Sequence, residues 1–479
     1  MDSNNVDYSF ISMPSFTQTS VVSFTDKDTY AVRAINQRIT LLNPAIELGS
    51  IYTAAVRQPS VKRTPRNYFP PPPIHRLPFE LLSAIFTTCM PGERSFVDCH
   101  AIPLLLGQIC RHWRHVALST TSLWRYIHVV LGRGKSAAWV PVWLSRSAGC
   151  SLSVMIYGLT SSEDASATLH SIIQHAHRWE DLDISLPGQL FHSFASIRWR
   201  LPLLRKVKMV NTADKVSSLR MCFDAPNLER IELSFGLEKV EPLSAALTHC
   251  TLRYGLLDCV EFIRRHPQIT HCSLHDCPTS PVPLQAPIVA QLVSLHVSNY
   301  TRHGVTAAFE CLTLPALREV SIALGNATPF PLISFMGLLS RSGYRLDHLA
   351  IHSGIIPIQN LISLLQRIPS LKKLEIHQPD TLYIGPLFFD QLVQRLTCGP
   401  FSPYSREPIL LPNLRSLSLC GRRLRINGDI VADMIQSRWH QRSPDIARLR
   451  AVALQGHSWD PKTAGRLEYF RREGLQVIL

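Results

Sequence analysis

From residue 179 onward, apolar residues recur in one short pattern, L-x-x-L-x-L, whose last two apolar positions are two residues apart. A spacing of two places alternate side chains on one face of a β-strand. The pattern occurs eleven times, and its apolar positions hold Trp179/Leu182/Ile184, Leu204/Val207/Met209, Leu228/Ile231/Leu233, Leu247/Cys250/Leu252, Ile269/Cys272/Leu274, Leu292/Leu295/Val297, Leu317/Val320/Ile322, Leu346/Leu349/Ile351, Leu371/Leu374/Ile376, Leu414/Leu417/Leu419 and Leu449/Val452/Leu454. The pattern therefore predicts eleven short strands, each with one apolar face.

Most copies are separated by about 20–29 residues, which is the period of leucine-rich repeats. Stretches with helical spacing, such as "DCVEFIRRH", "ISFMGLLSRS" and "IQNLISLLQRI", lie between the copies. One strand and one helix per repeat, stacked, predict a horseshoe with parallel strands inside and helices outside. The longer gap between Leu371 and Leu414 holds a helical stretch, "PLFFDQLVQRL", and the proline-rich "GPFSPYSREP", so we predict an insertion loop at about residues 380–412.

The residues that flank the last two apolar positions of each copy should point to the concave face of the horseshoe. They include Asp181, Asp183, Lys206, Lys208, Arg230, Glu232, His249, Thr251, Arg253, His271, Ser273, His275, His296, His348, His352, Lys373, Glu375, His377, Ser416 and Ser418. This face can serve as a binding surface for a folded or acidic partner. Our predicted target-binding residues are Lys206, Lys208, Arg230, His249, Arg253, His271, His275 and His296. The alternative is that each is ordinary polar strand surface.

Four of these histidines should form one patch. His271 and His275 belong to one predicted strand, and His249 and His296 belong to the strands on either side. Crowding of like charges would lower their pKa values, so the patch should be neutral near neutral pH and charged in acid. We therefore expect target binding to vary between about pH 6 and pH 7.5, with acidic targets binding better at the lower end.

Residues 74–126 have helical rather than strand spacing. Pro78 suits the first turn of a helix, and the apolar residues that follow recur on one helical face. A second apolar group, from Ile102 to Ala117, should again form one helical face. Cys110 lies on this face, and we expect it to be packed rather than reactive. About fifty residues make a thin core, so the unit needs a partner or a neighbouring domain to cover its apolar surface. The pattern alone leaves a partner-binding module and a capping module equally open.

Residues 74–129 resemble an F-box, and in particular the F-box proteins abundant in mushroom-forming fungi. The matching segments are the "LPFELL" opening, the Ile85–Phe86 pair, the "CRHWR" centre and the Leu123–Trp124 close. The resemblance continues loosely through "WLSRSAGCSLSVMIYG". The stretch "TTCMPGERSFVDCHAIPLLLG" is longer than the corresponding segment of a compact F-box.

The resemblance implies a function. F-box proteins bind a Skp-type adaptor, which joins them to a cullin and RING scaffold for ubiquitin transfer. On this basis the adaptor-binding residues would be Leu77, Pro78, Glu80, Leu81, Ile85, Phe86, Ile109, Cys110 and Trp113.

Residues 1–73 should be a partly disordered lead-in. A helical spacing from Val32 to Ile46 is interrupted by Pro44, and "QPSVKRTPRNYFPPPP" is typical of an extended linker. The first residues lack the features of a secretory signal, and no apolar run is long enough to span a membrane. The twelve cysteines are scattered without a CxxC pair, which favours reduced thiols in the cytoplasm, the nucleus or both.

Charge and motifs add little further chemistry. The formal net charge of +14 is spread along the chain rather than massed in one tract, which argues against nucleic acid as a partner. "LGRGKS" has Val129 where a phosphate loop needs glycine. The ligand types in "HCSLHDC", His271 to Cys277, alternate between two faces of a strand and cannot converge on one metal. We therefore predict no enzyme, no catalytic residue, no metal and no cofactor.

Together these patterns predict an α/β protein in which a small all-α F-box-like unit, residues 74–126, is followed by a leucine-rich-repeat horseshoe, residues 127–479. Its predicted function is recruitment of targets to a cullin–RING ubiquitin ligase of the SCF type, through a Skp-type adaptor and a target protein that the sequence does not name. The alternative is a repeat scaffold that binds proteins without a role in ubiquitin transfer. A third hypothesis, an RNA-associated repeat protein, rests on charge alone, and strong salt-sensitive binding would favour it.

Overall fold

In a computed structural model, the described residues are 73–90, 101–131, 136–158, 163–187, 190–191, 198–212, 218–219, 222–237, 244–277, 287–299, 302–325, 328–377, 387–398, 408–421, 426–440, 444–455 and 459–478. Residues 1–72 of the predicted N-terminal lead-in and residues 399–407 of the predicted insertion loop lie outside these residues. The chain divides into two compact units, residues 1–124 and residues 125–479. Among the described residues, no helix combines the length and the apolar character that crossing a membrane requires.

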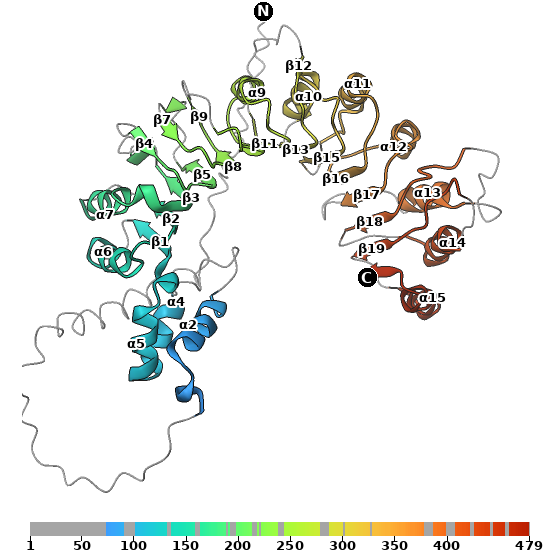
Figure 1. Cartoon of the computed structure of the whole chain (residues 1–479). Helices are drawn as coiled ribbons and strands as arrows, with labels where there is room; N and C mark the ends of the chain where they lie inside the picture. Colours follow the sequence, from blue (N-terminus) through green and yellow to red (C-terminus); the bar gives the residue numbers. More distant parts are fainter. Residues whose placement is uncertain are drawn as a thin grey trace, which may run out of the picture. The chain divides into compact units, whose positions relative to one another are not determined.

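The first unit is helical in its described residues (Figure 1). Its elements are η1 (Pro73–Arg76), α2 (Phe79–Thr88), α4 (Ala101–Ile109), α5 (Arg111–Ser119) and η2 (Thr121–Trp124). The expectation of one continuous helical face from Ile102 to Ala117 is wrong, because the chain breaks at Cys110. Cys110 is extended and is the N-cap of α5, where its Sγ accepts a hydrogen bond from the backbone N–H of Trp113 at 3.3 Å. Pro78 likewise lies just before α2, at its N-cap.

The core of the first unit forms where α2 packs against α5 and η2. Its buried apolar side chains include Leu82, Phe86, Val116, Ala117, Leu123 and Trp124, and α4 adds Leu104 and Leu106. The ring of Phe86 lies 4.9 Å from that of Trp113, measured between centroids. The indole N–H of Trp124 donates to the carbonyl oxygen of Ala117 at 2.9 Å, which satisfies its one polar group inside the core.

The second unit is built on one parallel sheet of 14 strands whose spatial order follows the sequence. The strands are β1 (Tyr126–Leu131), β2 (Leu152–Gly158), β3 (Trp179–Leu186), β5 (Lys206–Asn211), β8 (Arg230–Leu233), β10 (His249–Leu252), β11 (His271–His275), β13 (Ser294–Asn299), β15 (Glu319–Leu324), β16 (His348–His352), β17 (Lys373–His377), β18 (Ser416–Cys420), β19 (Ala451–Gln455) and β20 (Gln476–Ile478). The end of the segment to which the F-box resemblance loosely extended is therefore strand β2.

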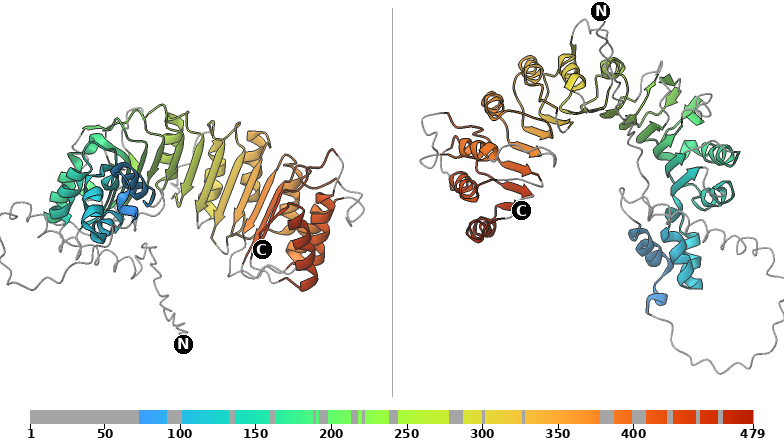
Figure 2. Two further views of the ribbon diagram at one scale, coloured as in Figure 1. Left: turned by 60° about the horizontal axis from the view of Figure 1, so that its bottom comes forward. Right: turned by 180° about the vertical axis from the view of Figure 1, so that it is seen from behind.

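Helices cover one face of this sheet (Figures 1 and 2). They are α6 (Ser136–Arg146), α7 (Glu163–Ile173), α9 (Leu256–Arg265), α10 (Arg302–Glu310), α11 (Leu332–Ser342), α12 (Ile358–Gln366), α13 (Leu387–Leu396), α14 (Gly428–Trp439) and α15 (Pro461–Arg472), with the short η3 (Ala176–Arg178). Three strand pairs supplement them: β4 (Arg198–Arg200) with β7 (Cys222–Asp224), β6 (Ser218–Leu219) with β9 (Gly236–Leu237), and β12 (Ile288–Val289) with β14 (Leu312–Thr313). The unit is thus α/β and consistent with a repeat-like solenoid.

The apolar positions of the repeated pattern form the core beneath the helices. Every residue that fills these positions in the eleven copies is at most 6% exposed. In β13, Leu295 and Val297 are buried, whereas His296 between them is only half-buried. The predicted strands and the predicted direction of their side chains are therefore confirmed for all eleven copies.

A buried arginine, Arg438, binds backbone groups in the long segment between the copies of the pattern that begin at Leu371 and Leu414. Arg438 in α14 is fully buried, and its guanidinium donates to the carbonyl oxygens of Leu396 (2.6 Å), Leu410 (2.7 Å) and Leu411 (3.0 Å). Leu411 has a φ of 53°, a left-handed conformation that is unusual for leucine. Arg438 thereby joins the end of α13 to the strained turn that leads into β18.

Substitutions in β13 test the assignment of the two sheet faces. Leu295→Asp should lower the free energy of unfolding by several kcal/mol, because it buries a charge that has no partner. His296→Ala, on the neighbouring position, should leave that free energy almost unchanged. Chemical denaturation followed by circular dichroism measures both, and equal losses would mean that the two faces have been exchanged.

Arg438→Met should also destabilise the second unit by several kcal/mol. It removes the donor to the carbonyl oxygen of Leu410 and the stronger donor to that of Leu396, and it takes one of two donors from that of Leu411. A buried polar group that loses its partner costs about 1–3 kcal/mol. Arg471→Met is a matched control, because Arg471 is largely exposed and pairs with Glu468 on the helix surface. Hydrogen exchange should show faster opening of α13 and α14 in Arg438→Met alone. Unchanged protection there would contradict the role assigned to this arginine.

Candidate functional site

Large apolar side chains are exposed on the helical unit. They are Ile74, Phe79, Leu81, Ile85, Leu105, Ile109 and Leu118, which we call the apolar surface. Leu81 and Ile85 are four residues apart on α2, and Leu105 and Ile109 are four residues apart on α4, so each pair shares one helical face. Leu82 and Phe86 lie about 100° further round α2 and are buried. Helix α2 therefore carries two adjacent apolar strips, of which the strip with Leu82 and Phe86 is covered and the strip with Leu81 and Ile85 is exposed.

The predicted adaptor-binding residues take three kinds of position. Pro78, Glu80, Leu81, Ile85 and Ile109 are exposed, whereas Leu77, Cys110 and Trp113 are half-buried. Phe86 is only 1% exposed, so it packs the core of the unit and offers no surface to another protein. Sequence reasoning did not select Leu105, although its spacing of four from Ile109 was a usable signal.

The second candidate surface is the face of the sheet opposite the helices, which we call the open face. The parallel register aligns its side chains in rows that cross the strands. The first row includes Asp181, Lys206, Arg230, His249, His271, Ser294, Glu319, His348, Lys373 and Ser416. The second row includes Asp183, Lys208, Glu232, Thr251, Ser273, His296, Ser321, Ala350, Glu375 and Ser418. The third row includes His275, Ser298, Ala323, His352, His377 and Cys420.

Oppositely charged side chains alternate at the N-terminal end of the open face. The ammonium of Lys208 lies 3.8 Å from Asp183 and 3.9 Å from Glu232, and Lys206 lies 4.0 Å from Asp181. The guanidinium of Arg253 lies 3.3 Å from the carboxylate of Glu232. An acidic partner would therefore have to replace carboxylates that already face three of the predicted basic residues.

The four central histidines form two pairs rather than one patch. His249 and His271 stack, with ring centroids 4.2 Å apart and ring planes 10° apart, and His275 and His296 lie 5.1 Å apart. The expectation of a single patch is wrong because His271 and His275 are four residues apart on one strand. That spacing separates their positions by about 13 Å.

A threonine hydroxyl contacts each ring of the first pair. The hydroxyl oxygen of Thr248 lies 2.8 Å from Nδ1 of His249, and the hydroxyl oxygen of Thr270 lies 2.8 Å from Nδ1 of His271. The same Thr-His sequence thus occurs at matching positions of two neighbouring strands. These hydrogen bonds hold the two rings in the orientation that lets them stack.

Burial, more than crowding, lowers the pKa values of His249, His275 and His296. It is the largest cause of the lowered pKa of His249, to which His271 and Arg230 also contribute. Burial, Arg253 and His296 together lower the pKa of His275 to about 4, and burial lowers the pKa of His296. The predicted direction holds, but His275 cannot change its charge between pH 6 and pH 7.5 as expected.

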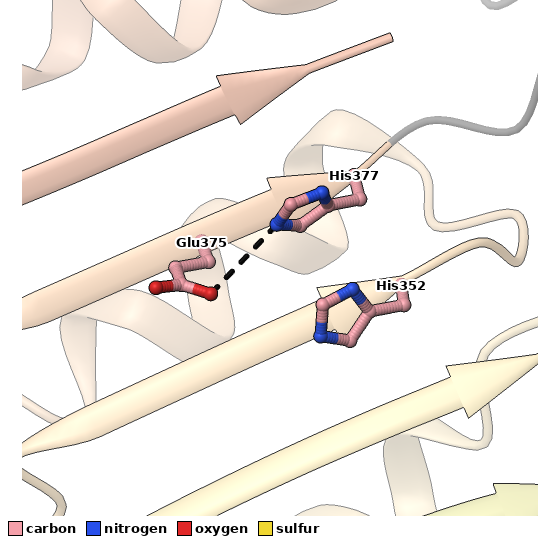
Figure 3. Close-up of side chains that lie close together, drawn as sticks. All are labelled: His352, Glu375 and His377. Carbon is pink, nitrogen blue, oxygen red and sulfur yellow. Dashed lines mark ion pairs between the residues drawn. The ribbon is translucent and has the colours of Figure 1, made fainter. Parts of the chain in front are cut away.

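A third histidine cluster lies where β16 and β17 end (Figure 3). His352 and His377 are register partners whose ring centroids are 4.4 Å apart, and Glu375 points from the second row toward His377. One carboxylate oxygen of Glu375 lies 3.7 Å from Nε2 of His377, and the other lies 2.5 Å from Nζ of Lys373. Sequence reasoning placed these residues on the open face but did not select them as a site.

The pKa of His275 can be tested directly. Between its pKa of about 4 in the folded chain and 6.5 in the unfolded chain, only the unfolded chain binds a proton at this residue. The free energy of unfolding should therefore fall as the pH drops below 6.5, and His275→Gln should lose less stability on acidification. Histidine-labelled NMR titration, with His275→Gln to assign the signal, should give a midpoint near 4. A midpoint near 6.5 would contradict the assignment.

No family model matches this chain, and no curated protein matches it either. The F-box resemblance of residues 74–129 therefore remains a prediction from motifs. The apolar surface of the helical unit and the open face of the sheet are the structural features from which we infer a function.

Proposed function

We propose that this protein is a non-enzymatic, substrate-recruiting subunit of a cullin–RING ubiquitin ligase of the SCF type. Its helical unit binds a Skp-type adaptor as an F-box does, and the adaptor links the protein to the cullin and RING scaffold. The observation that carries the proposal is the exposed pair Leu81 and Ile85 on α2, within the segment whose "LPFELL" and "CRHWR" motifs resemble an F-box.

The chemistry of the apolar surface supports adaptor binding. Fully burying a leucine or isoleucine side chain contributes about 1.5–3 kcal/mol. The pairs Leu81/Ile85 and Leu105/Ile109 offer four such side chains on two helices. Exposed residues spaced by four along a helix are the usual anchors when helices pack against another protein. Glu80 and Arg111, which are also exposed, supply polar groups close to these anchors.

The second unit, residues 125–479, which we call the repeat unit, is proposed to hold the target. We assign it as a leucine-rich-repeat horseshoe, on the basis of the recurring L-x-x-L-x-L pattern, its period and the in-order parallel strands. The open face then becomes the recognition surface, with side chains from many repeats aligned in rows. In this proposal the protein acts in the cytoplasm, the nucleus or both, where its scattered cysteines remain reduced.

The predicted role of Phe86 changes because of its burial. Phe86→Ala would remove a core ring and unfold the helical unit, so a loss of adaptor binding in that variant would be indirect. Ile85→Ala is the sharper substitution, because Ile85 is exposed on the same helix. It removes a candidate contact without opening a cavity in the core.

Ile85→Ala should weaken co-purification of a Skp-type adaptor and its cullin with the full chain by more than tenfold. Removing one anchor side chain at an interface typically costs about 2–4 kcal/mol, and about 1.4 kcal/mol corresponds to a factor of ten. Ile333→Ala is the matched control, because Ile333 is an exposed isoleucine on α11 of the repeat unit.

Circular dichroism should show that both variants remain folded. A wild-type chain that captures no adaptor would refute the proposed function and leave the alternative of a protein-binding repeat scaffold. Equal capture by Ile85→Ala and wild type would refute the assigned surface.

A further inference from the structure

The open face contains one group of side chains whose donor atoms converge. Each of His352, Glu375 and His377 has a nitrogen or oxygen ligand atom within 4.8 Å of the ligand atoms of the other two. Among the described residues, no other group of three histidine, cysteine, aspartate or glutamate side chains converges in this way. Two imidazoles and one carboxylate are the ligand types that bind zinc-like divalent ions in proteins.

The sheet itself brings the three side chains together. His352 and His377 are register partners on neighbouring parallel strands, which lie about 4.8 Å apart. Glu375 precedes His377 by two residues, so both side chains project from the same face. Figure 3 shows the two rings side by side and the carboxylate turned toward His377. The positions of all three residues are therefore fixed by regular secondary structure rather than by a loop.

The distances allow coordination after small rotations of the side chains. A tetrahedral zinc ion with bonds of about 2.0–2.1 Å needs ligand atoms about 3.4 Å apart. The carboxylate oxygen of Glu375 and Nε2 of His377 are already 3.7 Å apart. The rings of His352 and His377 are inclined by 32°, so turning about their side-chain bonds can direct a nitrogen of each toward a shared ion.

Two neighbouring side chains orient the carboxylate. The Oε1 atom of Glu375 lies 2.5 Å from the ammonium of Lys373 and 3.6 Å from Nε2 of His348, whereas Oε2 faces His377. Partners that occupy the outer oxygen of a metal-binding carboxylate hold the inner oxygen in position. The positive charge of Lys373 also weakens attraction for a cation, so this site should bind less tightly than a closed site with four protein ligands.

Charge distinguishes this cluster from the other two histidine pairs. His249 lies near both Arg230 and Glu229, whose effects on a positive charge at the ring oppose each other, and His275 lies near Arg253, which disfavours such a charge. His352 instead has the carboxylate of Glu375 nearby, which favours one. The three pairs have similar ring separations, but among the described residues a carboxylate oxygen converges with both rings only at His352 and His377, and this suits that pair to a cation.

We propose that His352, Glu375 and His377 bind a divalent transition-metal ion of the zinc type. Three protein ligands leave one coordination position open toward the open face. Water or a donor atom of a bound protein would complete the coordination. The proposal concerns metal binding alone and holds whether or not the chain recruits targets to a ubiquitin ligase. It departs from the sequence-based expectation of no metal, for which residues 271–277 were the one candidate segment.

The test measures binding of Zn²⁺ to the chelator-treated full chain by equilibrium dialysis with metal analysis. Wild type should bind one equivalent that His377→Gln loses, and Glu375→Gln should weaken that equivalent at least tenfold. His271→Gln is the matched control, because it removes one ring of a histidine pair that has no carboxylate partner of this kind. The same Zn²⁺ equivalent should raise the melting temperature of wild type and of His271→Gln, but not that of His377→Gln.

Substitution with Co²⁺ gives a second readout, since a tetrahedral Co²⁺ site absorbs strongly in the visible range. Wild type and His271→Gln should show this absorption, and His352→Gln should not. Equal loss of Zn²⁺ in His271→Gln and His377→Gln would overturn the proposal, because it would indicate scattered histidine binding. A wild-type chain that binds no more Zn²⁺ than His377→Gln would overturn it as well. Unfolding curves without metal should coincide for all variants, which excludes misfolding as the cause.

Discussion

The repeat unit depends on the exact alignment of apolar side chains across parallel strands. Each copy of the pattern places two inward residues two positions apart, and the register stacks them on those of its neighbours, as with Leu274 against Val297. No copy could bury its apolar face alone, since a single strand and helix have too little surface to exclude water. Burial therefore forces a one-residue alternation, and that alternation sends every intervening side chain to the open face.

The rows of side chains on the open face follow from the packing of this core. A strand supplies one side chain to each row, so residues far apart in the sequence, such as His352 and His377, become direct neighbours. Ion pairs occupy the part of the face near β3, β5 and β8. From β10 to β17 the face carries the three histidine pairs, and the ion pair of Lys373 with Glu375 lies beside the last of them. The two parts differ in electrostatic character because imidazoles lie beside imidazoles in the second part.

The sequence predicted the strands that follow from periodicity, but not the features that depend on how the elements pack. The eleven strands of the pattern were predictable, but β1, β2 and β20 were not. In β2, Ser153 and Met155 are buried like the residues beside them, so the strand lacks the alternation of buried and exposed positions. The division of α2 into a buried Phe86 and an exposed Ile85 depends on where α5 packs, which helical spacing alone does not specify. The break at Cys110 and the separation of the histidines into pairs likewise depend on local hydrogen bonds and on distance along a strand.

The in-order parallel stacking also has an evolutionary consequence. Duplicating or deleting one whole repeat would insert or remove one strand, moving the flanking strands by about 4.8 Å without disturbing the match between the remaining apolar layers. Side chains on the open face would keep their rows while gaining or losing one neighbour. Proteins built in this way can therefore change the length of their open face, and the side chains it carries, by recombination between repeats. The fold tolerates the change.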